Sequence, residues 1–416
     1  MRILCLVLAL VVLSNGLWAN ADGLDYLPQQ QYEEQRQIVT EYYSSGMLEN
    51  FEYGDIQTSA KPGADIQIDA KSAVLIEQST GTVLYDKNCD EKLPLASITK
   101  VMSLILIMEH IESGGLNLES TVVCSEHAAS MGGSQIWLEP NEEMSVNDLL
   151  KAVVIGSAND ATCALAEAVC GSEEAFVAKM NERANELGMK NTYFKNCSGL
   201  DADGHYSSAR DIAIMSRKLL EYDLITQYST VWMDTLRNGA TQLVNTNKLV
   251  RFYDGTTGLK TGTTNGAGCC VTASAQRNGL HLIAVVMGAD SSDKRFQSAR
   301  KLLDTGFANY QFKELSFNLK NDIVNVSNGM KLSLKLSKPE NYSLLLEKGQ
   351  ENNIKTEFNI PESVKAPIKK GDTVGRVIVK LGDKTIGTTD IKAAESVENM
   401  NLTNAFKRMC KYMFKL

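Results

Sequence analysis

The chain has 416 residues, of which 44% are hydrophobic and 22% are charged, as in ordinary globular proteins. This length predicts about two to three domains, and the composition excludes wholesale disorder, a collagen-like repeat and a disulfide-stapled miniprotein. The net charge of -8 has the wrong sign for a protein that coats a polyanion, so we expect no nucleic acid partner.

Residues 1–21 have the pattern of a secretory signal peptide. Arg2 precedes an apolar run over 3–13, and the segment ends at Ala19-Asn20-Ala21, a small-x-small cleavage pattern. An uncleaved anchor helix is the alternative, although the apolar run is shorter than the roughly 20 residues that a spanning helix needs. We therefore expect export to the extracytoplasmic face of a bacterial cell membrane.

Residues 22–65 hold polar runs with weak periodicity and are predicted to form an N-terminal extension of unknown role. A mixed domain, predicted over 66–313, follows. Its first apolar runs, at 73–77 and 82–85, lie on either side of a turn-forming segment and predict a hairpin.

A helix is predicted over 97–112, with Ser97 and Lys100 at its start. Its residues 101–108 are apolar on almost every side, which indicates burial at the centre of the domain. Three residues advance a helix by about 4.5 Å, so the lysine amine can reach the serine hydroxyl. Burial can lower the lysine pKa from about 10.4 and make the amine a base for a serine nucleophile. Serine and lysine at this spacing also occur by chance, so the pattern is weak by itself.

Further helices are predicted at 145–155, 160–169, 172–187 and 293–310. Ser157-Ala158-Asn159 lies in the turn between the first two of them. A hydroxyl there can relay a proton and an amide can bind a substrate carbonyl, although such a tripeptide is also an ordinary turn.

Three short runs separated by glycine-containing turns predict an antiparallel sheet: 258–263, 269–276 and 280–288. The first carries Lys260-Thr261-Gly262, which places a cation and a hydroxyl where an anionic ligand can lie against a strand edge. Gly262 would let that ligand approach the backbone closely. A phosphate-binding loop is the competing interpretation, but the segment lacks the required spacing of glycine and lysine.

The pattern of residues 317–393 predicts a small all-β domain. Residues 330–336 alternate between apolar and polar, and 373–381 can pair with 384–391 across Gly382-Asp383. We find no candidate catalytic residues in this region.

The last segment, 399–416, is predicted to be an amphipathic helix. Its apolar and basic residues recur on opposite sides, and no acid follows Glu398. The apolar set is Leu402, Phe406, Met409, Met413 and Leu416, and the basic set is Lys407, Arg408, Lys411 and Lys415. This pattern favours a helix that lies on an anionic membrane surface, and a helix docked on its own protein is the alternative.

The nine cysteines include no CxxC pair, so we expect no metal site. Cys269 and Cys270 are adjacent on a predicted strand and would point to opposite faces. Whether any cysteines form disulfides stays open.

The three motifs come in the order helix start, inter-helix turn and strand, an order that penicillin-binding proteins and class A β-lactamases share. From about residue 65 to its end, the chain resembles the low-molecular-mass penicillin-binding proteins, the D-alanyl-D-alanine carboxypeptidases of peptidase family S11. Residues 258–268, Gly-Leu-Lys-Thr-Gly-Thr-Thr-Asn-Gly-Ala-Gly, are similar to that family's longer signature. The resemblance implies an α+β, β-lactamase/transpeptidase-like catalytic domain, then the small β domain and the anchoring helix. The middle motif is Ser-Ala-Asn where many relatives have Ser-Asp-Asn or Ser-Gly-Asn.

The resemblance also implies roles for the first two motifs. Ser97 would attack the peptide bond between two D-alanines, and Lys100 would accept its proton. Ser157 would transfer a proton to the leaving D-alanine, while Asn159 would bind the substrate amide. Water would then hydrolyse the acyl-enzyme.

The remaining residues would hold the substrate. Lys260 and Thr261 would bind its terminal carboxylate, with help from Arg295, and the backbone N–H groups of Ser97 and Thr263 would form an oxyanion hole. The resemblance implies no cofactor. The expected partners are a peptidoglycan stem peptide ending in D-Ala-D-Ala, β-lactam antibiotics as covalent inhibitors, and the anionic membrane surface.

Two other functions fit the same motifs. A serine β-lactamase would share the acylation groups, but it needs a dedicated carboxylate to activate the deacylating water, and we identify none. A non-catalytic penicillin-binding sensor or scaffold is the other possibility. Endopeptidase activity on cross-links is compatible with the same site.

Overall fold

The computed structural model describes residues 66–413, without five side chains of its last helix: Asn404, Lys407, Arg408, Lys411 and Tyr412. The predicted signal peptide at 1–21, the extension at 22–65, Lys415 and Leu416 lie outside the described residues. Within 66–413, no helix is long and apolar enough to cross a membrane.

A five-stranded sheet with the order β2-β1-β9-β8-β7 forms the centre of the predicted catalytic domain. Every neighbouring pair in it is antiparallel, as predicted. The strands are β1 (Ser72–Glu77), β2 (Val83–Lys87), β7 (Thr256–Thr264), β8 (Gly268–Arg277) and β9 (Leu280–Ala289). The strand that carries the Lys-Thr-Gly motif, β7, is therefore an edge strand.

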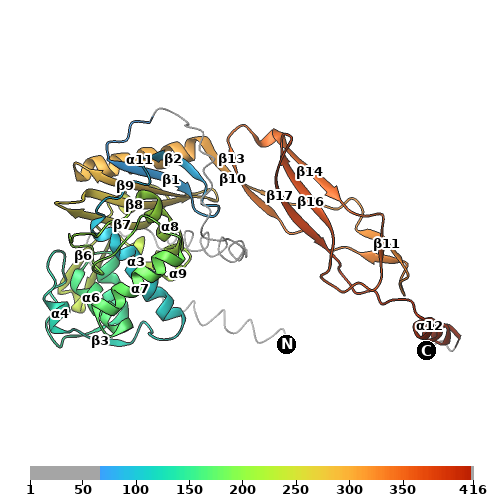
Figure 1. The fold of residues 1–416 in the computed structure, drawn as a ribbon, viewed down its shortest axis with the longest axis horizontal. Coiled ribbons are helices and arrows are strands. Elements are labelled where there is room, and N and C mark those ends of the chain that lie inside the picture. The colour runs from blue at the N-terminus through green and yellow to red at the C-terminus, as the bar shows by residue number, and fades with distance from the viewer. Residues whose placement is uncertain (1–65, 414–416) are drawn as a thin grey trace, which may run out of the picture. The chain divides into compact units, whose positions relative to one another are not determined.

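The two faces of this sheet pack against different layers. Because successive side chains of a strand point to opposite faces, β1 contributes Val74 and Ile76 to one core and Ala73 and Leu75 to the other. Helix α11 (Ser292–Asn309) covers the second face, and a cluster of shorter helices lies on the first (Figure 1). The domain thus has three layers.

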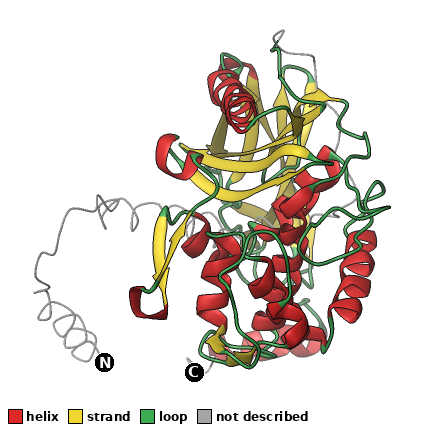
Figure 2. Ribbon diagram, turned by 90° about the vertical axis from the view of Figure 1, so that its left-hand side faces the viewer, coloured by secondary structure: helices red, strands yellow, loops and turns green. Residues whose placement is uncertain are grey.

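The helix predicted over 97–112 forms at the centre of that cluster. It begins as a 3-10 turn, η1 (Ala96–Thr99), and continues as α3 (Lys100–Glu112). Every residue of α3 from Lys100 to Met108 is buried, as the apolar pattern predicts. The helices around it lie on the side of the sheet opposite α11 (Figure 2). They include α5 (Val146–Val154), α6 (Asn159–Cys170), α7 (Glu173–Glu186), α8 (Ala209–Leu219) and α9 (Asp223–Ser229).

Short elements complete the catalytic domain. They are α4 (Glu126–Ala129), α10 (Leu249–Phe252), η2 (Arg237–Gly239), and the hairpins of β3 (Thr121–Val123) with β4 (Glu143–Ser145) and β5 (Met233–Leu236) with β6 (Thr241–Val244). None of these short elements is predicted from the sequence pattern.

The region between α11 and the last helix is all-β apart from one 3-10 turn, and it has its own core. Its strands are β10 (Tyr310–Leu315), β11 (Ile323–Ser327), β12 (Ser333–Lys335), β13 (Tyr342–Glu347), β14 (Ile354–Asn359), β15 (Ser363–Lys365), β16 (Thr373–Leu381) and β17 (Lys384–Lys392), with η3 at Glu351–Asn353. The predicted hairpin is confirmed, because β16 and β17 pair from Leu381 and Lys384 outward. The strand predicted over 330–336 is only partly right: β12 begins at Ser333, since the Met330 N–H bonds to the Glu398 carbonyl.

The last described element is α12 (Leu402–Met413). Four large apolar side chains on it are exposed: Leu402, Phe406, Met409 and Met413. Their spacing of three or four residues places them on one side of the helix.

Candidate active site

Ser97 and Lys100 meet as their spacing predicts. Ser97 lies in the 3-10 turn η1 and is partly exposed, while Lys100 begins α3 and is fully buried. The lysine Nζ lies 3.1 Å from the serine Oγ. A hydroxyl at the surface is thus in contact with an amine that water does not reach.

The other neighbours of the Lys100 amine are both carbonyl oxygens. Nζ donates to Asn159 Oδ1 at 2.5 Å and to the backbone carbonyl of Ser198 at 2.7 Å. Carbonyls only accept, so the two N–H bonds of a neutral amine are directed to them and its lone pair is left for Ser97 Oγ. Burial lowers the pKa of Lys100 from 10.5 to about 7, although Cys197 and Asp160 act in the opposite direction.

The Ser157-Ala158-Asn159 motif forms the predicted turn between α5 and α6. Ser157 is buried and has φ of 61°, a left-handed conformation that is uncommon for a residue with a side chain. Asn159 opens α6, and its Nδ2 donates to the Gly132 carbonyl at 2.6 Å. Both ends of this amide are therefore bonded within the protein, whereas the family resemblance implies a contact with the substrate.

Strand β7 brings the third motif beside Ser97. A Cβ added at Gly262 would lie 2.8 Å from the Ser97 backbone nitrogen. Gly262 thus allows close approach of the protein's own backbone, which is a different reason for a glycine from the ligand contact that we expected. Thr263, the next residue, is exposed.

Lys260 is a second buried amine on this strand. Its Nζ donates to the Thr261 carbonyl at 3.1 Å, and the Thr261 hydroxyl donates to Thr246 Oγ1 at 2.8 Å. Burial, together with the positive charges of Lys100 and Arg295, lowers the pKa of Lys260 well below 10.5. The three cations are therefore close enough to affect one another, and a bound anion would stabilise them.

Arg295 reaches β7 from α11. Its Nη1 donates to the Gly262 carbonyl at 3.0 Å and to Thr263 Oγ1 at 2.9 Å. The side chain is buried, and its Nε has no hydrogen-bond partner among the described residues. Arg295 therefore holds the strand segment that follows Lys260 and Thr261.

Three further groups lie near Ser97 and Lys100, and no sequence motif marks them. The first is the Ser198 carbonyl. The second is His205, whose Nε2 lies 2.8 Å from Thr99 Oγ1 in η1. Burial lowers the pKa of His205 to about 4, so the ring is neutral at pH 7. The third is Asp160, a buried carboxylate that accepts N–H bonds from Ile136 and Leu138.

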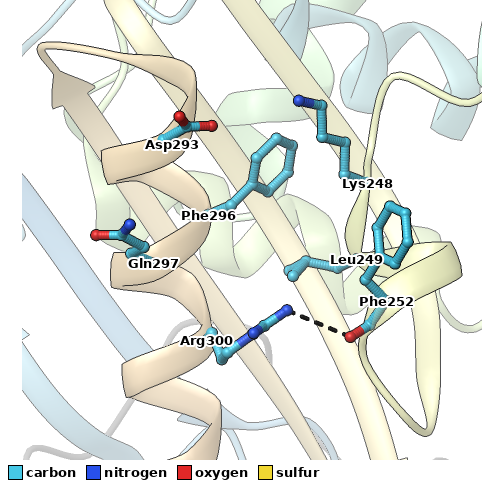
Figure 3. A pocket seen from close by; sticks show the side chains of 7 residues that line it. All are labelled: Lys248, Leu249, Phe252, Asp293, Phe296, Gln297 and Arg300. Carbon is cyan, nitrogen blue, oxygen red and sulfur yellow. Dashed lines mark hydrogen bonds between the residues drawn. The ribbon is translucent and has the colours of Figure 1, made fainter.

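Two hollows lie in this domain. One, beside the turn of Ser97, is lined by residues that include Ala96, Gly199 and Gly266. The other is lined by residues of α10 and α11, including Phe252 and Phe296, and Arg300 donates to the Phe252 carbonyl there (Figure 3). None of the predicted site residues lines this second pocket.

Comparison with known proteins identifies the family. Residues 56–291 match the family model of the D-alanyl-D-alanine carboxypeptidases, peptidase S11, and residues 312–399 match the C-terminal domain of penicillin-binding protein 5. The D-alanyl-D-alanine carboxypeptidase DacF of Bacillus subtilis is 44% identical over 353 residues, which cover 84% of this chain and 91% of that protein.

Solved structures agree with this comparison. Penicillin-binding protein 5 of Haemophilus influenzae superposes with a TM-score of 0.68 at 31% identity, over 81% of this chain and 99% of that one. Penicillin-binding protein D2 of Listeria monocytogenes, in its ampicillin-bound form, gives a TM-score of 0.54 at 31% identity over 59% of this chain and 99% of that one. The fold, the extent of the match and the motif order lead to the same conclusion: the chain belongs to the S11 family of D-alanyl-D-alanine carboxypeptidases, which are hydrolases, and it carries the C-terminal domain of penicillin-binding protein 5.

Proposed function

We propose that Ser97 is the nucleophile of this carboxypeptidase and removes the terminal D-alanine from peptidoglycan stem pentapeptides through an acyl-enzyme. In this mechanism the Ser97 hydroxyl donates its proton to the Lys100 lone pair as its oxygen attacks the carbonyl between the two D-alanines. Ser157 then passes a proton to the leaving D-alanine. Water hydrolyses the ester and restores the enzyme.

The observation that carries the proposal is the environment of the Lys100 amine. With a pKa of about 7, roughly half of the molecules hold a neutral amine at pH 7, against about one in 3,000 for an ordinary lysine. The 3.1 Å separation from Ser97 Oγ is within hydrogen-bond reach, which a general base requires. The buried lysine is therefore poised to accept a proton near neutral pH.

We propose that the substrate carboxylate binds at β7. Lys260 and Thr261 supply a cation and a hydroxyl, and Arg295 positions Thr263 beside them. Because β7 is an edge strand, its outer backbone groups are available to an extended peptide. The N–H groups of Ser97 and Thr263 would form the oxyanion hole, and Asn159 acts mainly by orienting the Lys100 amine.

A β-lactam resembles the D-Ala-D-Ala end and would acylate Ser97, as the ampicillin-bound form of the Listeria relative suggests. Among the hydrogen bonds of residues 66–413, no carboxylate contacts Ser97 or Lys100. A carboxylate dedicated to deacylation is thus missing from that contact shell, and nothing in the comparisons favours a β-lactamase or a non-catalytic scaffold. We expect the penicilloyl ester to persist.

Two measurements on the purified chain test this function. The first is release of D-alanine from a pentapeptide ending in D-Ala-D-Ala, which Ser97→Ala should abolish. Ser113→Ala, at an exposed serine just after the same helix, is the matched control and should retain activity. The second is mass spectrometry after incubation with a penicillin, which should place the adduct on the tryptic peptide 93–100. An adduct elsewhere, or full activity in Ser97→Ala, would refute the assignment.

We further propose that the protein is exported under the direction of residues 1–21 and held at the extracytoplasmic membrane surface by its C-terminal helix. The exposed apolar side of α12 supports this proposal, since Leu402 is 92% and Met413 is 68% exposed. The basic residues of the same segment would attract anionic lipid.

Sedimentation with vesicles tests the membrane proposal. The chain should bind vesicles that contain phosphatidylglycerol, and high salt should weaken the binding. The double change Phe406→Glu and Met409→Glu should release it, whereas Leu332→Glu, at a residue of the β domain that is 76% exposed, should not. Equal binding by all three proteins would rule out α12 as the anchor.

A further inference from the structure

Four potential metal ligands converge behind the active site, although they are far apart in the sequence. They are His127 on α4, Cys163 on α6, Glu173 at the start of α7, and Cys197 in the loop before Ser198. The ligand atoms of Cys163, Glu173 and Cys197 all lie within 4.8 Å of one another. His127 joins this group through its Nε2, which is 2.8 Å from Glu173 Oε2.

The chemistry of this cluster is unusual for an ordinary core. Both cysteines are buried, and all eight cysteines within 66–413 are free thiols. The Glu173 carboxylate is already oriented, because its Oε1 accepts the Cys197 backbone N–H at 3.0 Å. Two sulfurs, one imidazole nitrogen and one carboxylate oxygen make up a donor set that suits Zn²⁺.

We propose that Cys163, Cys197, Glu173 and His127 form a binding site for one Zn²⁺ ion. This departs from the sequence expectation of no metal site, which rested on the absence of CxxC spacing. Tetrahedral coordination with bonds of about 2.0–2.3 Å puts ligand atoms about 3.3–3.8 Å apart. The sulfurs and the carboxylate, within 4.8 Å of one another, therefore need to close by at most about 1–1.5 Å, and His127 Nε2 and Glu173 Oε2, 2.8 Å apart, need to separate by about 0.5 Å. The exposed imidazole of His127 provides the side from which the ion enters. Glu167 forms a second, overlapping group with His127 and Cys163, but it is not grouped with Cys197.

The site is connected to the catalytic lysine by a single loop. The Cys197 carbonyl accepts from Ser103 Oγ on α3 at 2.6 Å, and the next carbonyl, of Ser198, accepts from Lys100 Nζ. Gly199 follows with φ of 92° and packs against the backbone of Ala96 and Ser97. A metal bound to Cys197 would therefore fix the loop that orients the general base, and this consequence alone rests on the proposed function.

Metal binding can be tested without any activity measurement. The purified full chain is reduced, stripped of metal, loaded with Zn²⁺ and gel-filtered, and its zinc content is measured by mass spectrometry. Co²⁺ is loaded in parallel, because thiolate ligands give it an intense near-ultraviolet charge-transfer band. Cys163→Ser and Cys197→Ser remove one thiolate each. Cys170→Ser is the matched control, since Cys170 lies on the same helix outside the cluster.

We expect one zinc per chain, a thiolate band with Co²⁺, and affinity more than about a hundredfold weaker in each cluster serine variant, since loss of a second-shell partner alone costs about tenfold to a hundredfold, with Cys170→Ser unchanged. His127→Ala should also weaken binding, and this change at an exposed residue leaves the buried core intact if the serine variants fail to fold. The proposal is wrong if the wild type retains no zinc after loading and gel filtration. It is also wrong if His127→Ala and the cluster serine variants bind zinc as tightly as the wild type does. It is equally wrong if the untreated protein is lighter than the fully reduced chain by two hydrogen atoms and yields linked Cys163 and Cys197 peptides, because the two cysteines then form a disulfide.

A second measurement separates this site from the proposed function. Zinc binding with unchanged penicillin acylation would leave the site valid and remove its link to Lys100. Loss of acylation in Ser97→Ala with zinc retained would show that zinc binding does not require the Ser97 hydroxyl, so failure of the proposed function would leave the metal site standing.

Discussion

The pKa of Lys100 determines how the proposed reaction depends on pH. The amine must be neutral to accept the Ser97 proton, and its pKa is lowered to about 7 because it is fully buried. Its neutral fraction is therefore about nine-tenths at pH 8 and about one-tenth at pH 6.

We predict that the rate at which penicillin acylates Ser97 falls about tenfold between pH 8 and pH 6, with a midpoint near 7. Stopped-flow acylation over this range measures it. Lys100→Met should reduce the rate at pH 8 by about 10²–10⁴-fold and remove this pH dependence. Lys195→Met, at an exposed lysine, serves as the control. A flat wild-type profile between pH 6 and 8 would mean that another group accepts the proton.

Gly262 sets the distance between β7 and Ser97. An added Cβ would lie 2.8 Å from the Ser97 nitrogen and 2.9 Å from the Leu95 carbonyl oxygen, both of them backbone atoms that cannot rotate away. We predict that Gly262→Ala lowers the acylation rate by about tenfold or more, because a displacement of less than 1 Å in a reacting site has effects of this size. Gly132→Ala is the control, since a Cβ there meets nothing within 4 Å. Equal rates in the two variants would show that the strand can move without cost.

Only the local part of the site could be predicted from the sequence. The contact of Ser97 with Lys100 follows from helix geometry, since the residues are three apart. The Ser198 carbonyl and His205 act on the same turn from positions about a hundred residues away. Every residue has a backbone carbonyl, so the sequence does not show which one binds the lysine. A lone histidine likewise does not show which residue it contacts. Family resemblance supplied Asn159, but the bond of its amide to Lys100 became evident only in the folded chain.

At the level of elements, the start of α6 depends on one buried carboxylate. Asp160 accepts N–H bonds from Ile136, Leu138 and Ala161, and it thereby joins the loop before α5 to the helix that carries Asn159. Removing the charge leaves buried N–H groups with poorer partners.

We predict that Asp160→Asn destabilises the catalytic domain by about 2–4 kcal/mol, because hydrogen bonds to a charged group contribute about 1.5–3 kcal/mol each. Urea unfolding followed by fluorescence measures the free energy of unfolding. Asp203→Asn, at an exposed aspartate, should stay within about 0.5 kcal/mol of the wild type. A similarly small change in Asp160→Asn would mean that solvent or rearranged side chains satisfy those N–H groups.

The long elements were predictable and the short ones were not. The five strands of the sheet and the helices α3, α5, α6, α7 and α11 have apolar patterns long enough to show their periodicity. Helix α8 was missed even though nine of its eleven residues are buried, because polar residues that are buried, such as Asp211 and Arg217, break the apolar pattern. Arg217 is buried because it donates to the carbonyls of Gln78 and Ser79, which a sequence cannot reveal.

In the described chain as a whole, hydrophobic burial is divided among three cores. Two of them lie on opposite faces of the same sheet and share its strands, so they should unfold together. The third is formed within the β domain by residues such as Leu334, Val377 and Ile391. A core that shares no buried residue with the others can be lost separately.

We predict two thermal transitions for the full chain, of which only one responds to a β-lactam. Acylation of Ser97 adds contacts between η1 and β7, which belong to the catalytic domain, and should raise the Tm of that transition by about 4–10 °C. This corresponds to about 2–3 kcal/mol, since each kcal/mol shifts Tm by about 2–4 °C in a domain of this size. Differential scanning calorimetry with and without penicillin measures both transitions, and Ser97→Ala should show no shift. If a single transition moves as a whole, the β domain must unfold cooperatively with the catalytic domain, in spite of its separate core.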